Sequence, residues 1–386
     1  MGRRIAIILG LAALLNMYAG YAIIGRAAWA QNHPLAAWLL VAGFFLLQLA
    51  GPFGHRLFFA GHRRRPVSGF LVSTLDWSSY LAFGAMSCLV VFGIVADIIT
   101  VVWAVIAPPA FDHAAFDHTV LLALLGATAL TVLVGLVQAT QPRVRRIDVP
   151  LPHLPSAFDG FKIAQISDLH VGPTIGKRYA CRVVEIANAE TPDVVALTGD
   201  FVDGTVADFA ADVAPLADLR APEGVFYVTG NHEYFWDAGQ WIAVFRQLGA
   251  RVLINEHELI RRGPDTIAVA GVTDISTRHM SGVHAFSPQR ALAGVPEGVT
   301  KILLAHQPIS FTAAAAAGAD LQLSGHTHAG QYFPFTLLIG FFQRYARGLN
   351  RHGNMWIYVN RGTGYWGPPL RTGAPPEITL LTLRRA

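Results

Sequence analysis

Five stretches of the sequence end an apolar run on side chains of the kinds that bind metal ions. In chain order the polar residues are Asp168 and His170, Asp200, Asn231 with His232 and Glu233, His306, and His326 with His328. A short apolar run closed by a turn is typical of a buried β-strand. In an open α/β sheet, ligands bind beside the strand ends. The five stretches therefore predict a metal site along one edge of a sheet.

The spacing of these residues favours two metal ions. Asp168 and His170 are one residue apart, so on an extended strand end both side chains would point to the same side. His326 and His328 have the same spacing and would each serve a different metal. Two metals about 3.5–4 Å apart need a shared oxygen ligand, and Asp200, which follows a glycine, is the natural candidate. Oxygen and imidazole ligands without thiolate favour Mn, Fe or Zn.

Taken in order, these motifs resemble those of the calcineurin-like metallophosphoesterase superfamily, over about residues 160–330. The resemblance implies an α/β domain that is a four-layer α/β/β/α sandwich with a dinuclear metal centre. It assigns Asp168, His170, Asp200 and His328 to metal one, and Asp200, Asn231, His306 and His326 to metal two. We leave out Glu233, which we expect to hydrogen-bond nearby backbone.

The resemblance also implies a reaction. A metal-bridging hydroxide would attack phosphorus in line, so that Asp200 is catalytic as well as a ligand. His232 would lie close to the metals without binding them, and it would stabilise or protonate the departing oxygen. The protein-phosphatase branch has an arginine after Gly-Asp-x-Val-Asp-, which is absent after Asp203 here. This difference argues against a phosphoprotein phosphatase.

The C-terminal stretch from Asn360 to Glu377 resembles the bacterial membrane-associated branch of the superfamily. Some members of that branch hydrolyse the pyrophosphate of UDP-diacylglucosamine. We therefore expect Arg361 and Arg371 to contact a phosphate and Trp366 to contact a lipid or base. The alternative is that Trp366 is a core residue and both arginines are surface charges.

The composition indicates that much of the chain lies in lipid. Hydrophobic residues make up 53% of the 386 residues and charged residues only 14%, whereas soluble domains carry about 25% charged residues. Apolar runs long enough to span a bilayer, which takes about 20 residues, cover residues 5–24 and 35–53, part of 78–107, and about 119–139. We predict an all-α membrane domain of about four transmembrane helices over residues 1–146, and the metallophosphoesterase domain over residues 147–386.

Basic residues indicate the orientation in the membrane. Four spans place Arg3 and Arg4, Arg63–Arg65, and Arg143 with Arg145 and Arg146 on one side. By the positive-inside rule that side is cytoplasmic. The catalytic domain is then predicted at the cytoplasmic face of the inner membrane. This conclusion depends on an even number of spans.

Two further patterns belong to the second domain. Expected helices at about 176–190, 206–220 and 238–249 alternate with the strands, as in α/β folds. An apolar patch from Phe333 to Phe342 follows the last metal motif. It would either contact the membrane and acyl chains or form a buried helix.

Cys88 and Cys181 are too few for a disulfide framework.

These features predict a membrane-anchored, metal-dependent phosphoesterase. Its substrate would be a phosphodiester or pyrophosphate, for example a lipid-linked compound such as UDP-diacylglucosamine, with membrane lipid as a second partner. A soluble phosphodiester is the enzyme alternative, and a catalytically silent metal-binding sensor or scaffold is the non-enzyme alternative. Few intramembrane charges, mainly Asp97, argue against a transporter. The net charge of +4 gives no reason to expect nucleic acid. The oligomeric state stays open.

Overall fold

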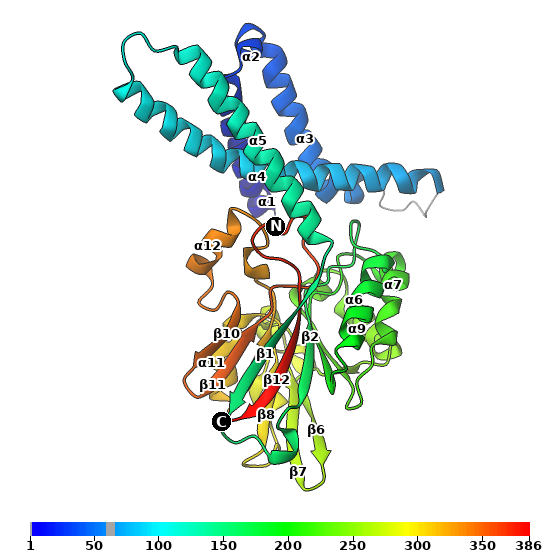
Figure 1. The fold of residues 1–386 in the computed structure, drawn as a ribbon. Helices are drawn as coiled ribbons and strands as arrows, with labels where there is room; N and C mark the ends of the chain where they lie inside the picture. Colours follow the sequence, from blue (N-terminus) through cyan, green and yellow to red (C-terminus); the bar gives the residue numbers. More distant parts are fainter. Residues whose placement is uncertain (1, 59–65) are drawn as a thin grey trace. The chain divides into compact units, whose positions relative to one another are not determined.

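The fold was analysed in a computed structural model, which describes residues 2–58 and 66–386 (Figure 1). The predicted basic loop Arg63–Arg65 lies outside the described residues. The chain forms two compact units. One holds the residues up to Val137 together with Gly367–Thr372, and the other holds Gln138–Trp366 together with Gly373–Ala386.

The first unit is helical. Its helices are α1 (Gly2–Ile24), α2 (Ala28–Asn32), α3 (Pro34–Phe58), α4 (Pro66–Ile106) and α5 (His113–Ala139). Among the described residues, four stretches within these helices are long and apolar enough to cross a membrane: 6–24, 34–51, 73–106 and 113–139. The shortest has 18 residues, about 27 Å of helix, close to the hydrocarbon thickness of about 30 Å. The prediction of four helices that could span a membrane is therefore confirmed.

The ends of the later spans differ from the prediction. Helix α5 begins at His113, before the expected start of the span at about residue 119. The Asp112 carboxylate accepts a hydrogen bond from the Ala115 N–H (3.0 Å) and caps the helix there. Asp97 lies within α4 and pairs with Arg26, at 2.6 Å between Nη2 and Oδ1. The charge therefore does not end the helix.

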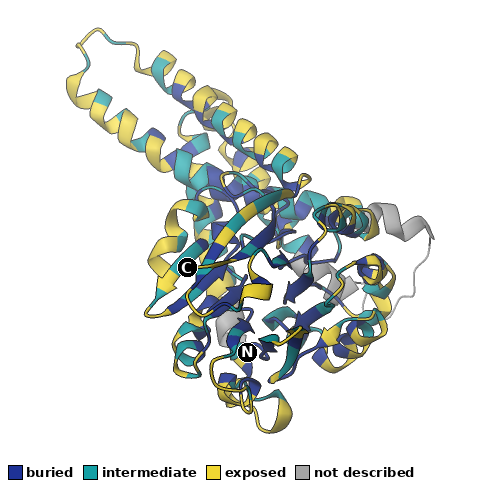
Figure 2. Cartoon of the chain, turned by 60° about the horizontal axis from the view of Figure 1, so that its bottom comes forward, coloured by how far each residue is buried: buried dark blue, intermediate teal, exposed yellow. Residues whose placement is uncertain are grey.

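Polar side chains and glycines hold the helical unit together. The buried amides of Asn16 and Gln48 exchange two hydrogen bonds (3.1 and 2.7 Å) between α1 and α3. Leu370, in the C-terminal segment of this unit, lies against Gly84 of α4 and Gly135 of α5. Small residues allow such close approach between elements in a membrane. Figure 2 shows exposed residues along much of the long helices, as expected for surfaces that face lipid.

The second unit contains two six-stranded sheets. The first has the order β1 (Arg143–Leu151), β12 (Glu377–Arg385), β2 (Lys162–Ile166), β3 (Val194–Thr198), β4 (Val225–Val228), β5 (Arg251–Val252). The second has the order β10 (Gly348–His352), β11 (Met355–Val359), β9 (Leu321–Ser324), β8 (Thr300–Leu304), β7 (Asp265–Gly271), β6 (Glu256–Arg262). Strands β2, β3 and β4 run parallel, and so do β7, β8 and β9.

Helices connect or follow these strands. They are α6 (Lys177–Ala189), α7 (Val206–Val213), α8 (Asn231–Phe235), α9 (Ala238–Gln247), α10 (Pro288–Ala291), α11 (Phe311–Ala316) and α12 (Phe335–Phe342). Short 3-10 helices cover Ser156–Phe158, Ala214–Asp218, Ile275–His279, Gly282–His284, Pro308–Ser310 and His328–Gly330. The three predicted helices correspond to α6, to α7 with the 3-10 turn after it, and to α9.

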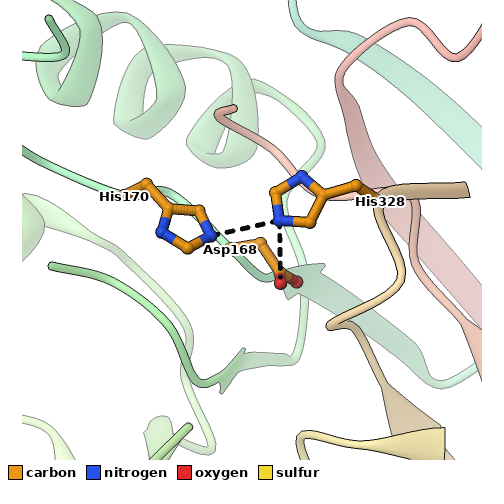
Figure 3. A group of neighbouring side chains, drawn as sticks. All are labelled: Asp168, His170 and His328. Atoms are coloured by element: carbon orange, nitrogen blue, oxygen red, sulfur yellow. Dashed lines mark hydrogen bonds and ion pairs between the residues drawn. The ribbon is translucent and has the colours of Figure 1, made fainter. Parts of the chain in front are cut away.

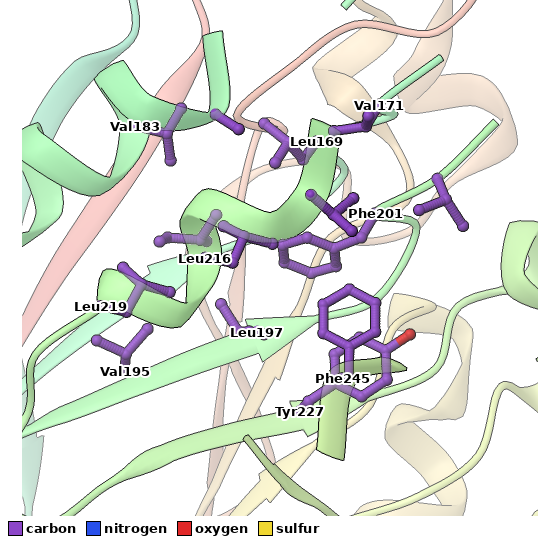
Figure 4. Packing of buried hydrophobic residues seen from close by; sticks show 14 of the residues in the cluster. Leu169, Val171, Val183, Val195, Leu197, Phe201, Leu216, Leu219, Tyr227 and Phe245 are labelled. Atoms are coloured by element: carbon purple, nitrogen blue, oxygen red, sulfur yellow. The ribbon is translucent and has the colours of Figure 1, made fainter. Parts of the chain in front are cut away.

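Alternation of side chains along the strands builds the layers. In β3, Val195 and Leu197 pack against the helical layer of α6 and α9, whereas Val194 and Ala196 face the second sheet. Figure 4 shows the first of these clusters, in which the Tyr227 and Phe245 rings stack and Phe201 meets both of them edge-on. A third cluster covers the outer face of the second sheet with α10 and α11. The predicted four-layer sandwich is therefore confirmed.

The boundary between the units lies earlier than residue 147. The basic residues that we assigned to the end of the membrane domain form β1, where they pair with the second unit: Arg146 with Glu190 at 2.6 Å and Arg145 with Glu377 at 3.8 Å. Strand β1 runs beside β12 over its whole length. Arg143–Arg146 are thus part of the sheet.

Candidate metal centre

The strand ends bring the predicted residues to one region. Asp168 and His170 follow β2, Asp200 follows β3, and Asn231 begins α8 after the two residues that follow β4. In the second sheet His306 follows β8, and His326 and His328 follow β9. Parallel strands end at the same edge of a sheet. The topology therefore places side chains from more than 150 positions apart within contact distance.

Asp168, His170 and His328 form the first group (Figure 3). The two imidazole Nε2 atoms are 3.1 Å apart, and His328 Nε2 is 3.3 Å from Asp168 Oδ1. All three side chains are buried. Buried imidazole nitrogens that face one another beside a carboxylate are a donor set suited to a divalent cation.

Asp200, His306 and His326 form the second group. His306 Nε2 is 3.0 Å from Asp200 Oδ2 and 3.3 Å from His326 Nδ1. The other ring nitrogen of His306, Nδ1, lies 2.8 Å from the Thr198 carbonyl oxygen and donates to it. This bond leaves the Nε2 lone pair facing Asp200, which is the usual arrangement of a metal-binding histidine. The residues fit a bound cation.

Asp203 joins the first group to His232. Its two carboxylate oxygens contact Nδ1 of His170 (3.2 Å) and Nδ1 of His232 (2.5 Å). His232 Nε2 lies 3.9 Å from Asp200. Burial opposes the charge of His232, but the Asp200 and Asp203 carboxylates outweigh it and raise the pKa of His232 to about 9. The structure therefore places a positively charged imidazole, oriented by the Asp203 carboxylate, beside Asp200.

Sequence reasoning did not include Asp203 among the site residues. Asp203 lies three residues after Asp200, and this short spacing could have marked it as a site residue. Nothing in the sequence, however, shows that one carboxylate reaches two histidines. Burial opposes ionisation of Asp203, yet His170 and His232 on either side hold the pKa of this carboxyl well below its usual range. Asp203 is a positioning residue for both imidazoles.

Glu233 has the structural role that we expected. Its buried carboxylate accepts hydrogen bonds from the backbone N–H groups of Asp200 (3.1 Å), Phe201 (2.7 Å) and Gly230 (2.6 Å). These bonds fix the loop that carries Asp200. A methyl group at Gly230 would overlap the Asp200 carboxylate, so that only glycine fits there.

The backbone at the site is not extended as the sequence spacing suggested. Strand β2 ends at Ile166, and both Asp168 and His170 have left-handed conformations, with φ of 54° and 53°. Asp200, His326 and His328 share this conformation, with φ of 55°, 69° and 48°. It costs of order 1–3 kcal/mol per residue outside glycine and clusters at functional sites. The side chains converge because of these turns.

The residues predicted to contact substrate have different surroundings in the structure. Trp366 is 57% exposed, so that its alternative as a core residue is wrong, and its ring lies 5.9 Å from that of His232. Arg361 forms an ion pair with Glu377, at 3.4 Å. Arg371 is fully buried in the helical unit, where its backbone N–H donates to the Gly135 carbonyl oxygen (3.0 Å). Arg371 is therefore not a surface charge. Asn231 lies near Gln307, whose Nε2 is 3.5 Å from Asn231 Oδ1.

Sequence comparison with known proteins identifies the family of the chain. Residues 161–330 match the calcineurin-like phosphoesterase family. An uncharacterized metallophosphoesterase of Aquifex aeolicus is 33% identical over 63% of the chain and 92% of its own length. The uncharacterized metallophosphoesterase YkuE of Bacillus subtilis is 32% identical over 60% of the chain and 82% of its own length. The chain belongs to the calcineurin-like metallophosphoesterase family.

Some relatives are described as transmembrane proteins. A bovine (Bos taurus) transmembrane protein with a metallophosphoesterase domain is 38% identical over 69% of the chain. The match spans only 62% of that relative's length, and 66% of the zebrafish (Danio rerio) protein of the same name. With its four candidate spans, this metallophosphoesterase is a multi-pass membrane protein.

The contact between Asp203 and His232 leads to a prediction. Asp203→Asn keeps the shape but removes the charge that orients both imidazoles, so we expect the kcat of this metallophosphoesterase on bis(p-nitrophenyl) phosphate to fall about 10–100-fold. The rates are measured with excess added metal, because loss of the Asp203–His170 contact (3.2 Å) is expected to weaken metal binding as well. Asp218→Asn, at an exposed carboxylate, is the control. Unchanged kcat in Asp203→Asn would contradict the positioning role.

Proposed function

We propose that the chain is a membrane-anchored, metal-dependent phosphoesterase that hydrolyses a phosphodiester or pyrophosphate bond in a lipid-linked substrate. The observation that carries the proposal is the Asp203–His232 pair beside two groups of buried histidines and carboxylates. A protein that only binds metal has no need of an oriented proton carrier next to its ligands. The proposal therefore favours an enzyme over a silent sensor.

Each residue has a role in this proposal. Asp168, His170, Asp200 and His328 would hold metal one, and Asp200, Asn231, His306 and His326 would hold metal two. When bound, two divalent cations, Mn, Fe or Zn, supply a nucleophilic oxygen at neutral pH and offset the charge of the phosphoryl group.

The remaining chemistry belongs to His232. Protonated on Nε2, it donates a proton to the oxygen of the departing group, and Asp203 at Nδ1 stabilises the imidazolium beforehand. The histidine regains its proton from water after the product leaves. Its half-buried side chain keeps access to solvent.

Two features support a lipid-linked substrate. The chain has four candidate spans, so that the site is confined near lipid. Trp366 and Phe235 are exposed (57% and 64%), and both rings lie within 6 Å of the His232 ring. Exposed aromatic side chains at a charged site suit a ligand with both a phosphate and an apolar part. We place the site on the cytoplasmic side, since Arg143, Arg145 and Arg146 follow the last span.

The test uses the purified full-length protein in vesicles, stripped of metal by a chelator. We expect Mn, Fe or Zn to restore hydrolysis, with a higher kcat/KM for UDP-diacylglucosamine than for UDP-glucose or bis(p-nitrophenyl) phosphate. Equal kcat/KM for the soluble compounds would favour a soluble substrate. Metal bound at full stoichiometry with no turnover of any of them would favour the sensor.

A further inference from the structure

Helix α12 (Phe335–Phe342) presents an apolar surface that its own domain does not cover. Each of its described residues is exposed or half-buried, and Phe341 and Phe342 are 84% and 77% exposed. Its sequence, Phe-Thr-Leu-Leu-Ile-Gly-Phe-Phe, contains no charged residue. The alternative of a buried helix is therefore wrong. Exposed apolar patches of this kind mark interaction sites with protein or membrane.

The base of α12 lies where the chain leaves the domain. Gln331, just before the helix, exchanges two hydrogen bonds with the Trp366 backbone, at 2.9 and 2.8 Å. Thr336 lies against Gly373, with atoms within 4 Å of where a Cβ there would stand. Trp366 and Gly373 border the segment Gly367–Thr372, which belongs to the helical unit. Within the domain, α12 therefore marks the end from which the chain passes into the membrane unit.

The opposite end of the domain has a different character. The turn between β6 and β7 lies at the far end of the sheets from α12 (Figure 1), and its residues Gly263 and Pro264 are exposed. This turn follows Arg261 and Arg262 and precedes Asp265. The domain therefore has an apolar helix at one end and a charged turn at the opposite end.

Positive charge follows the apolar residues of α12. Arg344 and Arg347 lie two and five residues after the end of the helix and are exposed. The Arg344 guanidinium lies over the Phe311 ring at 5.6 Å. An apolar helix flanked by exposed cations suits a bilayer surface, where acyl chains take the apolar side chains and anionic headgroups pair with the arginines.

We propose that α12 inserts its apolar side chains into the lipid interface on the side of the membrane that holds the catalytic domain. The four spans already hold the chain in a bilayer, so that lipid is always present at high local concentration. The helix then holds the domain against the membrane surface. The inference concerns contact with lipid and does not depend on the reaction.

The test measures the depth of a spin label in the full-length protein. Phe341→Cys is labelled in a background of Cys88→Ala and Cys181→Ala, in vesicles of phosphatidylethanolamine and phosphatidylglycerol. Leu337→Cys, one turn earlier on the same side of the helix, is a second position. Pro264→Cys in the β6–β7 turn is the matched control. Each labelled protein is checked for a thermal unfolding temperature like that of the unlabelled protein, so that only folded protein is compared.

We expect the ratio of accessibility to oxygen over accessibility to a neutral nickel chelate to be several-fold higher at residues 341 and 337 than at 264. Oxygen concentrates in acyl chains, whereas the chelate stays in water. Equal ratios at the three positions would show α12 in water and overturn the proposal. Low accessibility to both reagents at 341 and 337 would show protein covering the helix, as in a dimer, and would also overturn it. Neither outcome depends on the natural substrate.

Discussion

Asp200→Asn is expected to abolish hydrolysis and to reduce bound metal. Asp200 Oδ2 contacts His306 (3.0 Å), and Oδ1 accepts a hydrogen bond from the backbone N–H of His232 (2.8 Å). The carboxylate therefore connects the second group of candidate ligands with His232. We propose that it also serves both metals. Its loss should lower kcat/KM by more than the roughly 10–100-fold that removal of an outer partner costs. The measurements are rates on bis(p-nitrophenyl) phosphate with added Mn, and metal content by elemental analysis.

Asp218→Asn is the matched control, because its exposed side chain lies outside the site. It should keep both rate and metal content. Thermal unfolding of the two variants separates loss of metal from loss of fold. Full activity in Asp200→Asn would exclude a bridging role for this residue.

His232→Ala is expected to slow hydrolysis by about 10²–10⁴-fold where the leaving group needs a proton. His232 lies 2.5 Å from Asp203 and 3.9 Å from Asp200, and in our proposal it is not a ligand. Metal content should therefore be unchanged. The kcat for diphenyl phosphate, which releases the weakly acidic phenol, should fall more than the kcat for bis(p-nitrophenyl) phosphate, which releases a more acidic phenol. The readout is the ratio of the two kcat values.

His279→Ala, at an exposed histidine, serves as the control and should leave both kcat values unchanged. An equal loss on both substrates in His232→Ala would point to positioning of the substrate and against proton donation. Loss of metal in this variant would instead make His232 a ligand.

The sequence alone determined the architecture of both units. Four apolar stretches are long enough to span a bilayer, and length and hydrophobicity suffice for that inference because lipid excludes unpaired backbone. Apolar runs that end at Asp168, Asp200 and His306 predicted β2, β3 and β8 because buried parallel strands read as unbroken apolar segments. Motif order was enough to indicate the family, which the match over residues 161–330 supports.

The tertiary structure decided what the residues at the strand ends contact. Sequence spacing cannot show that Asp203 reaches His170 and His232 together, since those contacts span 33 and 29 positions and depend on how two loops turn. Left-handed backbone at Asp168 and His170 replaces the extended geometry that the spacing suggested.

Which side chains are buried was likewise decided only by the tertiary structure. Arg371 and Phe341 are both ambiguous in sequence, one a charge and the other an apolar residue. The structure buries the arginine completely and leaves Phe341 84% exposed. Composition reports what a side chain prefers, whereas exposure depends on which elements pack over it. For this protein the sequence therefore determined the strands, spans and candidate ligands, and the packing of loops and helices decided which side chains meet at the site and which face outward.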